Sequence, residues 1–225
     1  LRFLLESGQL DDALYFGESA VAQVPSPSLL SHLALGYALA PGQRNWLMLQ
    51  RLVRGLEGID NPEVGAVCEL ALGLRKWYEN QDGAPHLRKS VFLARRSHSP
   101  SFYFYALLAL GLAQQTQNPQ KALAISHYLL SQTASRGFAT QHEYSRLLRA
   151  QLLLSEGHEP TGLLEFEAKT PLAQLWKALL LGVAQGKKPT LRAHRFRGYG
   201  ILGVWVRWFS SQPVQSLELR SELPE

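Results

Sequence analysis

A short apolar segment with glycine at its fourth position recurs along the chain, and this repetition limits the possible folds more than any other feature. The copies are Leu33–Tyr37, Leu70–Leu74, Leu108–Leu112 and Leu179–Val183. Their glycines, Gly36, Gly73, Gly111 and Gly182, are separated by 37, 38 and 71 residues, so the last interval is about twice the others. A regular period of this length is typical of a solenoid. The doubled interval predicts one degenerate copy around residues 144–154.

Each copy lies in a stretch whose apolar residues have helical spacing, as Leu29, Leu33 and Tyr37 do. We call these stretches the first helices of the repeat. Glycine inside a helix costs about 0.5–1 kcal/mol relative to alanine, so its recurrence at one point needs a structural reason. We expect a partner helix to approach the backbone closely there.

Second helices are predicted between the copies, which gives tandem antiparallel helix pairs. Their expected ranges are 45–56, 85–97, 119–135 and 161–168. Asn61-Pro62 and Asn118-Pro119 each place a capping residue before a proline at the first helical position. The fold class is therefore predominantly all-α, with an α-α superhelix over residues 1–186.

The repeat resembles the tetratricopeptide repeat, whose first helix carries a Leu-Gly step followed by an aromatic residue and whose second helix carries alanines. Gly36 and Tyr37 match the first helix, and segments 8–16 and 118–128 match the second. The period is longer than the usual one of about thirty-four residues. The resemblance implies a solenoid that binds a protein or peptide in its groove, with no cofactor and no enzymatic activity.

The periodicity changes after residue 186. Apolar residues at alternate positions, Val204, Val206 and Trp208, favour short antiparallel strands, and 210–213 reads as a turn. Between 187 and 207 there is no acidic residue, and the basic residues are Lys187, Lys188, Arg192, Arg195, Arg197 and Arg207. Residues 187–225 are expected to form a short β segment that begins a second domain or caps the first.

The order of a basic strand, the run 203–208, a turn and the run 217–224 resembles the start of the winged-helix domain in bacterial transcriptional activators of the antibiotic-regulatory type. Such activators combine a winged helix with tetratricopeptide-like repeats. The resemblance implies a bacterial transcriptional regulator in which the repeats form a sensor module. Candidate DNA contacts are Lys187, Lys188, Arg192, Arg195 and Arg197. The alternative is a tetratricopeptide-type scaffold that binds a peptide or protein and has no role at DNA.

Four tyrosines are candidate partner contacts, because the first helices of a solenoid usually line its concave face. They are Tyr37, Tyr78, Tyr105 and Tyr144. The alternative for each is packing between helices. Trp77, Tyr103 and Tyr128 lie on apolar stripes, and for these three we favour packing.

A second basic cluster lies on the middle repeats and consists of Arg75, Lys76, Arg88, Lys89, Arg95 and Arg96. Such a cluster usually forms a solvated face. If it joined the C-terminal basic residues in space, the two could hold a nucleic-acid backbone, and binding would then weaken steeply with salt.

Catalytic, metal and cofactor sites are not expected. The seven histidines are scattered singly, without metal-ligand spacing. Gly198–Gly203 matches G-x-G-x-x-G, but strand-like residues follow it where a phosphate loop needs a helix. We interpret it as turns.

The remaining composition favours a cytoplasmic protein. Cys68 is the single cysteine, so an internal disulfide is excluded, and its apolar neighbours indicate a buried thiol. No apolar run is long enough to cross a membrane, and the N-terminus shows no secretion signal. The net charge of +5 permits an anionic partner. Because the chain starts inside an apparent helix and stops without a closing element, we expect a fragment of a longer polypeptide.

Overall fold

A computed structural model describes residues 10–40 and 42–185, and these residues form nine α-helices and no strand. The helices are α2 (Leu10–Gln23), α3 (Pro27–Leu39), α4 (Gln43–Gly55), α5 (Pro62–Tyr78), α6 (Ala84–Arg96), α7 (Pro100–Ala113), α8 (Pro119–Arg136), α9 (Ala139–Ser155) and α10 (Pro171–Ala184). The predicted predominantly α fold is confirmed for this part of the chain. The β segment predicted within 187–225 lies outside the described residues.

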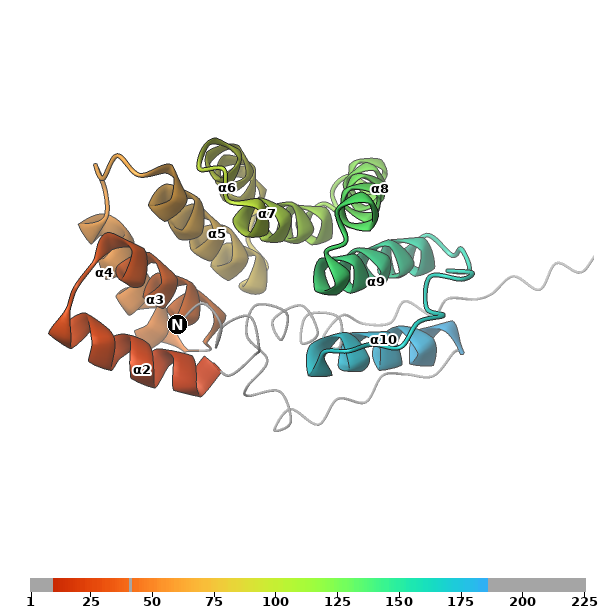
Figure 1. Cartoon of the computed structure of the whole chain (residues 1–225), viewed down its shortest axis with the longest axis horizontal. Coiled ribbons are helices and arrows are strands. Elements are labelled where there is room, and N and C mark those ends of the chain that lie inside the picture. The colour runs from red at the N-terminus through yellow and green to blue at the C-terminus, as the bar shows by residue number, and fades with distance from the viewer. Residues whose placement is uncertain (1–9, 41, 186–225) are drawn as a thin grey trace, which may run out of the picture.

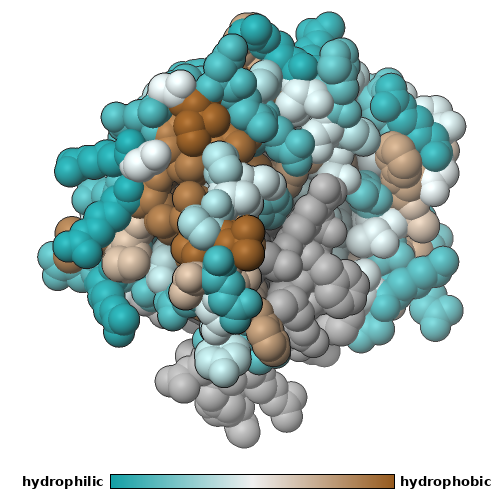
Figure 2. Space-filling model, turned by 60° about the vertical axis from the view of Figure 1, so that its left-hand side comes forward, coloured by the Kyte–Doolittle hydropathy of each residue, from teal (hydrophilic) through white to brown (hydrophobic). Residues whose placement is uncertain are grey.

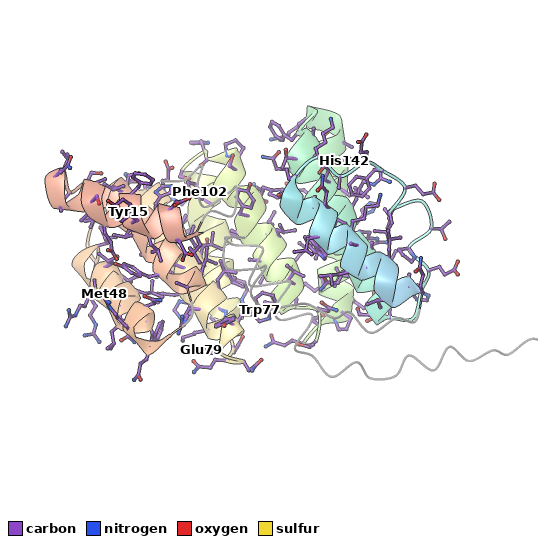
Figure 3. The ribbon with its side chains drawn as sticks, turned by 90° about the horizontal axis from the view of Figure 1, so that it is seen from below. Tyr15, Met48, Trp77, Glu79, Phe102 and His142 are labelled. Carbon is purple, nitrogen blue, oxygen red and sulfur yellow. The ribbon has the colours of Figure 1, made fainter. Side chains whose placement is uncertain are left out.

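The helices form a curved array in which each packs against the next (Figure 1). The first helices of successive pairs, α3, α5, α7 and α9, also pack against one another. In Figure 1, α6 and α8 lie on the outside of the curve and α7 and α9 on its inside. Tyr15 on α2 and His142 on α9 mark opposite ends of the array (Figure 3). None of the helices in the described ranges is long and apolar enough to cross a membrane.

The inner and outer helices differ in how much of their surface is buried. Every residue of α3 from 31 to 39, and every residue of α7 from 104 to 113, is buried. Apart from Ser31 and His32, neither segment carries a strongly polar side chain, as expected for a helix covered on all sides. In α4 only Leu49 is buried, and Arg44, Arg51 and Arg54 are exposed. The two kinds of helix thus differ in burial, with α4 on the surface and α3 and α7 inside.

The predicted capping residues start the helices as expected. Asn61 accepts hydrogen bonds from the backbone amides of Glu63 and Val64, and Asn118 accepts one from Lys121. A proline follows each cap, where its missing N–H costs no hydrogen bond. Asn61 and Asn118 thus fix the first turns of α5 and α8.

Two of the recurring glycines lie at close helix contacts. A Cβ atom on Gly73 would lie 2.7 Å from the side chain of Leu87, and one on Gly111 would lie 3.1 Å from Leu148. The predicted close approach is confirmed at these two positions. At Gly182 a Cβ atom would meet no atom of the described residues within 4 Å, and the chain beyond residue 185 lies outside those residues, so the close approach stays a prediction there.

The second helix predicted at 161–168 is also wrong. This segment is a series of turns, with Gly162 at a φ of +73°. Arg146 of α9 donates hydrogen bonds to the carbonyls of Gly162, Leu163 and Glu165. Its guanidinium also lies 4.7 Å from the centre of the Phe166 ring. The carbonyls of the segment are therefore satisfied by a neighbouring side chain instead of by a helix of their own.

Candidate functional site

Three of the four candidate tyrosines lie inside the array. Tyr37 is buried on α3, and its hydroxyl donates a hydrogen bond to Glu18 of α2. Tyr144 is buried on α9, where its hydroxyl lies 3.1 Å from that of Thr170, the residue that caps α10. Tyr105 is buried on α7 and meets Phe104 edge to face. This corrects the expectation that these rings are available on an open face, because they fill space between helices.

The environment of Tyr37 also keeps its hydroxyl protonated. Burial raises the pKa of this phenol, and the hydrogen bond to Glu18 and the negative charge of that carboxylate raise it further. Its proton therefore stays in place as part of the contact between α2 and α3.

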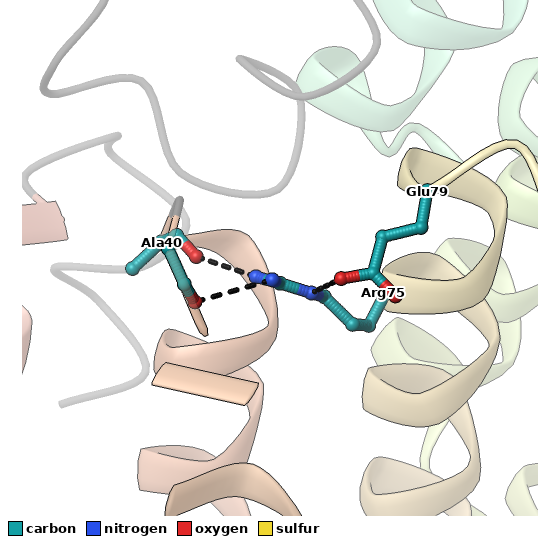
Figure 4. A network of polar contacts seen from close by, with 4 residues as sticks. Ala40, Arg75 and Glu79 are labelled. Carbon is teal, nitrogen blue, oxygen red and sulfur yellow. Dashed lines mark hydrogen bonds and ion pairs between the residues drawn. The ribbon is translucent and has the colours of Figure 1, made fainter. Parts of the chain in front are cut away.

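Tyr78, the fourth candidate, is half-buried beside the guanidinium of Arg75. The Arg75 side chain is 4% exposed and donates hydrogen bonds to Glu79 and to the carbonyls of Ala40 and Gly42 (Figure 4). It also lies 5.8 Å from the centre of the Tyr78 ring and 5.9 Å from that of Trp46. Arg75 thus ties the end of α3 to α5 and has no free surface for a ligand.

The basic cluster of the middle repeats therefore divides into two groups. In the first group the cations have partners: Arg75 is buried and hydrogen-bonded, and Lys89 forms an ion pair with Glu69 at 2.6 Å. Arg88, Arg95 and Arg96 are exposed on α6. The C-terminal candidates Lys187, Lys188, Arg192, Arg195 and Arg197 lie outside the described residues, and so does Gly198–Gly203.

A cleft opens where α6 turns into α7 and α8 packs beside them. Its mouth has a volume of about 680 Å³ and is lined by Ala94, Arg95, His98, Ser99, Pro100, Tyr103, Tyr128 and Arg136. A smaller hollow of about 80 Å³ continues from it, with Phe104, Leu129, Gln132, Thr133 and Phe138 as additional lining residues. We call the mouth and this floor together the α6–α8 cleft. The mouth falls within the range of about 300–1,000 Å³ that is typical of ligand sites.

Two tyrosines form the wall between the mouth and the floor. Both side chains line the mouth and the floor, and Tyr128 is 42% exposed. Burial raises the pKa of Tyr103 to about 12, and the neighbouring Tyr128 side chain acts in the same direction. Arg95 acts in the opposite direction on the same hydroxyl, which places its guanidinium near the pair. The Tyr103 phenol therefore keeps its proton near neutral pH, and a phenol hydroxyl can serve as a hydrogen-bond donor.

The cleft is electropositive. Arg95 and Arg136 line its mouth, and neither forms an ion pair among the described residues. No acidic residue occurs in the sequence between Asp82 and Glu143, the stretch that supplies all of α6, α7 and α8. His98 adds a further basic group at the turn between α6 and α7, in a left-handed conformation with a φ of +54°.

Sequence reasoning assigned Tyr103 and Tyr128 to packing. Tyr103 does pack against the core, but Tyr128 is exposed, and the cleft that both residues line was not predicted. The buried residues of α8 are Ala122, Ser126, Leu129 and Thr133, which places Tyr128 one position outside the buried stripe. Two of those four residues are polar, so the stripe is hard to recognise by hydropathy. The long stretch without acidic residues is the signal that could have indicated the site.

Two other surface features are less suited to recognition by charge. A cavity of about 380 Å³ between α9, α10 and the intervening turns has largely apolar walls, with Glu159 and Glu165 among its lining residues. Figure 2 shows hydrophobic side chains gathered on the end of the array that carries the N-terminal helices. Tyr15 and Phe16 of α2 and Leu47 of α4 are more than half exposed.

Within the described ranges, no group of three or more His, Cys, Asp or Glu side chains could hold a metal ion.

In comparisons with known proteins, no family model, no curated protein and no solved structure matches the chain. Its function is therefore inferred from the shape and charge of its surface.

Proposed function

We propose that this chain is a protein-interaction module of the helical-repeat type and that the α6–α8 cleft is its recognition site. The observation that carries this proposal is a pair of arginines, Arg95 and Arg136, that line one cleft without an ion-pair partner among the described residues. Unpaired guanidinium groups beside exposed aromatic rings are typical of protein-binding surfaces, in which arginine and tyrosine are enriched.

The position of the cleft in the array supports the same function. Repeat arrays bind partners on surfaces built from several successive units, and the cleft takes its lining from α6, α7 and α8. Three of the four tyrosines expected in the groove are buried between helices, so recognition is assigned to the cleft between α6, α7 and α8. The resemblance to tetratricopeptide repeats, a family of peptide-binding modules, supports a peptide as the class of partner.

Selection from a random peptide display library tests the proposal. The bait is the whole chain, and the counter-bait carries Tyr128→Ala and Arg136→Ala, two exposed positions where truncation should leave the fold intact. We expect peptides that bind the first protein and not the second. The proposal is wrong if every selected peptide binds both proteins equally while circular dichroism shows the same helical content.

The C-terminal resemblance extends the proposal to a regulatory role. If residues 187–225 begin a winged helix, the array would be the sensor module of a bacterial transcriptional regulator, with Lys187, Lys188, Arg192, Arg195 and Arg197 near the DNA. This extension rests on the sequence alone. It predicts that a longer protein containing the complete winged helix binds promoter DNA tightly while the present chain binds it weakly. Equal and sequence-independent binding by both would contradict it and would favour the plain scaffold.

A further inference from the structure

Resting on the function proposed above, we infer that the occupant of the α6–α8 cleft is an acidic peptide segment of a partner protein, in which an aliphatic side chain lies between carboxylates. Three properties of the cleft lead to this assignment. They are its uncompensated positive charge, its hydrogen-bond donors and the size of its apolar floor.

The charge at the mouth selects for an anion. Arg95 reaches the mouth from α6 and Arg136 from the end of α8, so the two guanidinium groups flank the opening. Every residue that lines the cleft is basic or uncharged. A carboxylate between these groups would form charge-assisted hydrogen bonds, which are roughly twice as strong as neutral ones.

The neutral groups beside the arginines also favour a carboxylate. Tyr103 and Tyr128 both line the cleft, and each carries a phenol hydroxyl that can donate one hydrogen bond. A ligand carboxylate accepts hydrogen bonds and donates none. It therefore complements two guanidinium groups and a phenol, whereas a neutral amide would leave its own N–H groups facing these donors.

The floor limits what can accompany the anion. Phe104, Leu129 and Phe138 give the floor its apolar lining, and its volume is about 80 Å³. An aliphatic side chain complements this small apolar floor. A peptide can therefore place carboxylates at the mouth and an aliphatic side chain on the floor, whereas the phosphates of a nucleic acid would be confined to the mouth.

Fluorescence anisotropy with the whole chain and short labelled peptides tests the inference. The first peptide has glutamates on both sides of one leucine. The second has glutamine in place of every glutamate, the third has lysine, and the fourth keeps the glutamates but replaces the leucine with glycine. A labelled single-stranded oligonucleotide of mixed sequence is the fifth probe.

We expect the glutamate–leucine peptide to bind tightest. Loss of either its charges or its leucine should weaken binding on the order of tenfold or more, because the first change removes hydrogen bonds to charged groups and the second removes apolar burial. The double variant with Arg95→Glu and Arg136→Glu should lose the acidic peptide and gain affinity for the lysine peptide. Arg88→Glu is the matched control, since Arg88 is exposed on α6 but does not line the cleft. It should change affinity far less.

The alternative outcomes separate this inference from the proposed function. If the glutamine or lysine peptide binds as tightly as the acidic one and loses affinity with Tyr128→Ala, the assigned ligand class is wrong and the peptide-binding function stands. If none of these peptides, and none selected from the library, depends on the cleft, both are wrong. If the oligonucleotide binds through Arg95 and Arg136 and the acidic peptide does not compete, the cleft is a nucleic-acid site and the inference is overturned.

Discussion

A Cβ atom on Gly83 would lie 2.2 Å from the carbonyl oxygen of Gly73, so the residue that precedes α6 lies directly against the backbone of α5. Gly83 has ordinary right-handed backbone angles. The need for glycine at this position is therefore steric and has nothing to do with conformational freedom. Glycine at position 73 of α5 answers a different contact, because a Cβ atom there would meet the side chain of Leu87 at 2.7 Å.

Gly83→Ala should destabilise the protein by about 1–3 kcal/mol, because the added methyl group meets a backbone carbonyl that cannot rotate away. Gly55→Ala is the matched control. Gly55 is the last residue of α4, and a Cβ atom there would meet nothing within 4 Å, so alanine should be neutral or stabilise by up to about 1 kcal/mol. Urea denaturation followed by circular dichroism measures both changes. Equal effects at the two positions would contradict the close contact.

Replacing Arg75 with methionine should also destabilise the array. Arg75→Met leaves Glu79 and the carbonyls of Ala40 and Gly42 without their donor, at a cost of about 1–3 kcal/mol. Arg75→Lys should recover only part of the loss, since an ammonium group cannot reproduce the fork that reaches three acceptors. Arg51→Met, at an exposed position of α4, should stay within about 0.5 kcal/mol of the parent protein. A full rescue by lysine would show that charge alone matters.

The stability should fall with decreasing pH in part through His142. Burial lowers the pKa of this imidazole in the folded protein, and the positive charge of Arg146 lowers it further. The unfolded chain, with a histidine pKa near about 6.5, therefore binds the proton first as the pH falls. The contribution of His142 to the free energy of unfolding is complete above the pKa of the unfolded state. It is lost as the pH falls from that pKa to the lower pKa of the folded state.

Urea unfolding at about pH 7.5 and about pH 5.5 measures this dependence. His142→Gln should reduce the difference between the two conditions. His127→Gln, at an exposed position of α8, is the control and should leave the difference unchanged. An unchanged difference in the His142 variant would show that other groups carry the dependence.

Cys68 should resist alkylation in the folded protein. Burial raises the pKa of this thiol to about 12, and the neighbouring charge of Glu69 acts in the same direction. The reactive thiolate is therefore scarce near neutral pH. Iodoacetamide should label the chain in urea and only slowly in native buffer. Mass spectrometry detects the change without ambiguity, because the sequence contains no other cysteine. Equal labelling rates with and without urea would contradict a buried Cys68.

The sequence predicted the helices well where apolar periodicity and capping residues agreed. Asn61-Pro62 and Asn118-Pro119 mark the starts of α5 and α8 because a cap acts within one turn and needs no distant partner. The segment 161–168 was mispredicted because its backbone conformation depends on Arg146, a residue on another helix. Local pattern could not supply that information.

The candidate site was harder to predict for the same physical reason. Arg75 looks like a surface cation, but its acceptors at Ala40 and Gly42 lie a full repeat earlier in the chain. Tyr128 looks like a core residue, but packing through Ser126 and Thr133 turns its ring outward. Whether each of these two side chains is buried or exposed depends on contacts between helices that are distant in the chain. Such contacts cannot be recognised in a single sequence.

Side-chain hydrogen bonds join successive repeats at nearly constant separations along the chain. Arg75 bonds to Ala40, Gln117 to Asp82 and Gln151 to Gln115, at separations of 35, 35 and 36 residues. Each such bond spans only one junction, so a pulling force applied to the two ends would load the junctions in series. The array should then lengthen by one helix pair at a time, as an extensible tether whose weakest junction sets the force at which it first yields.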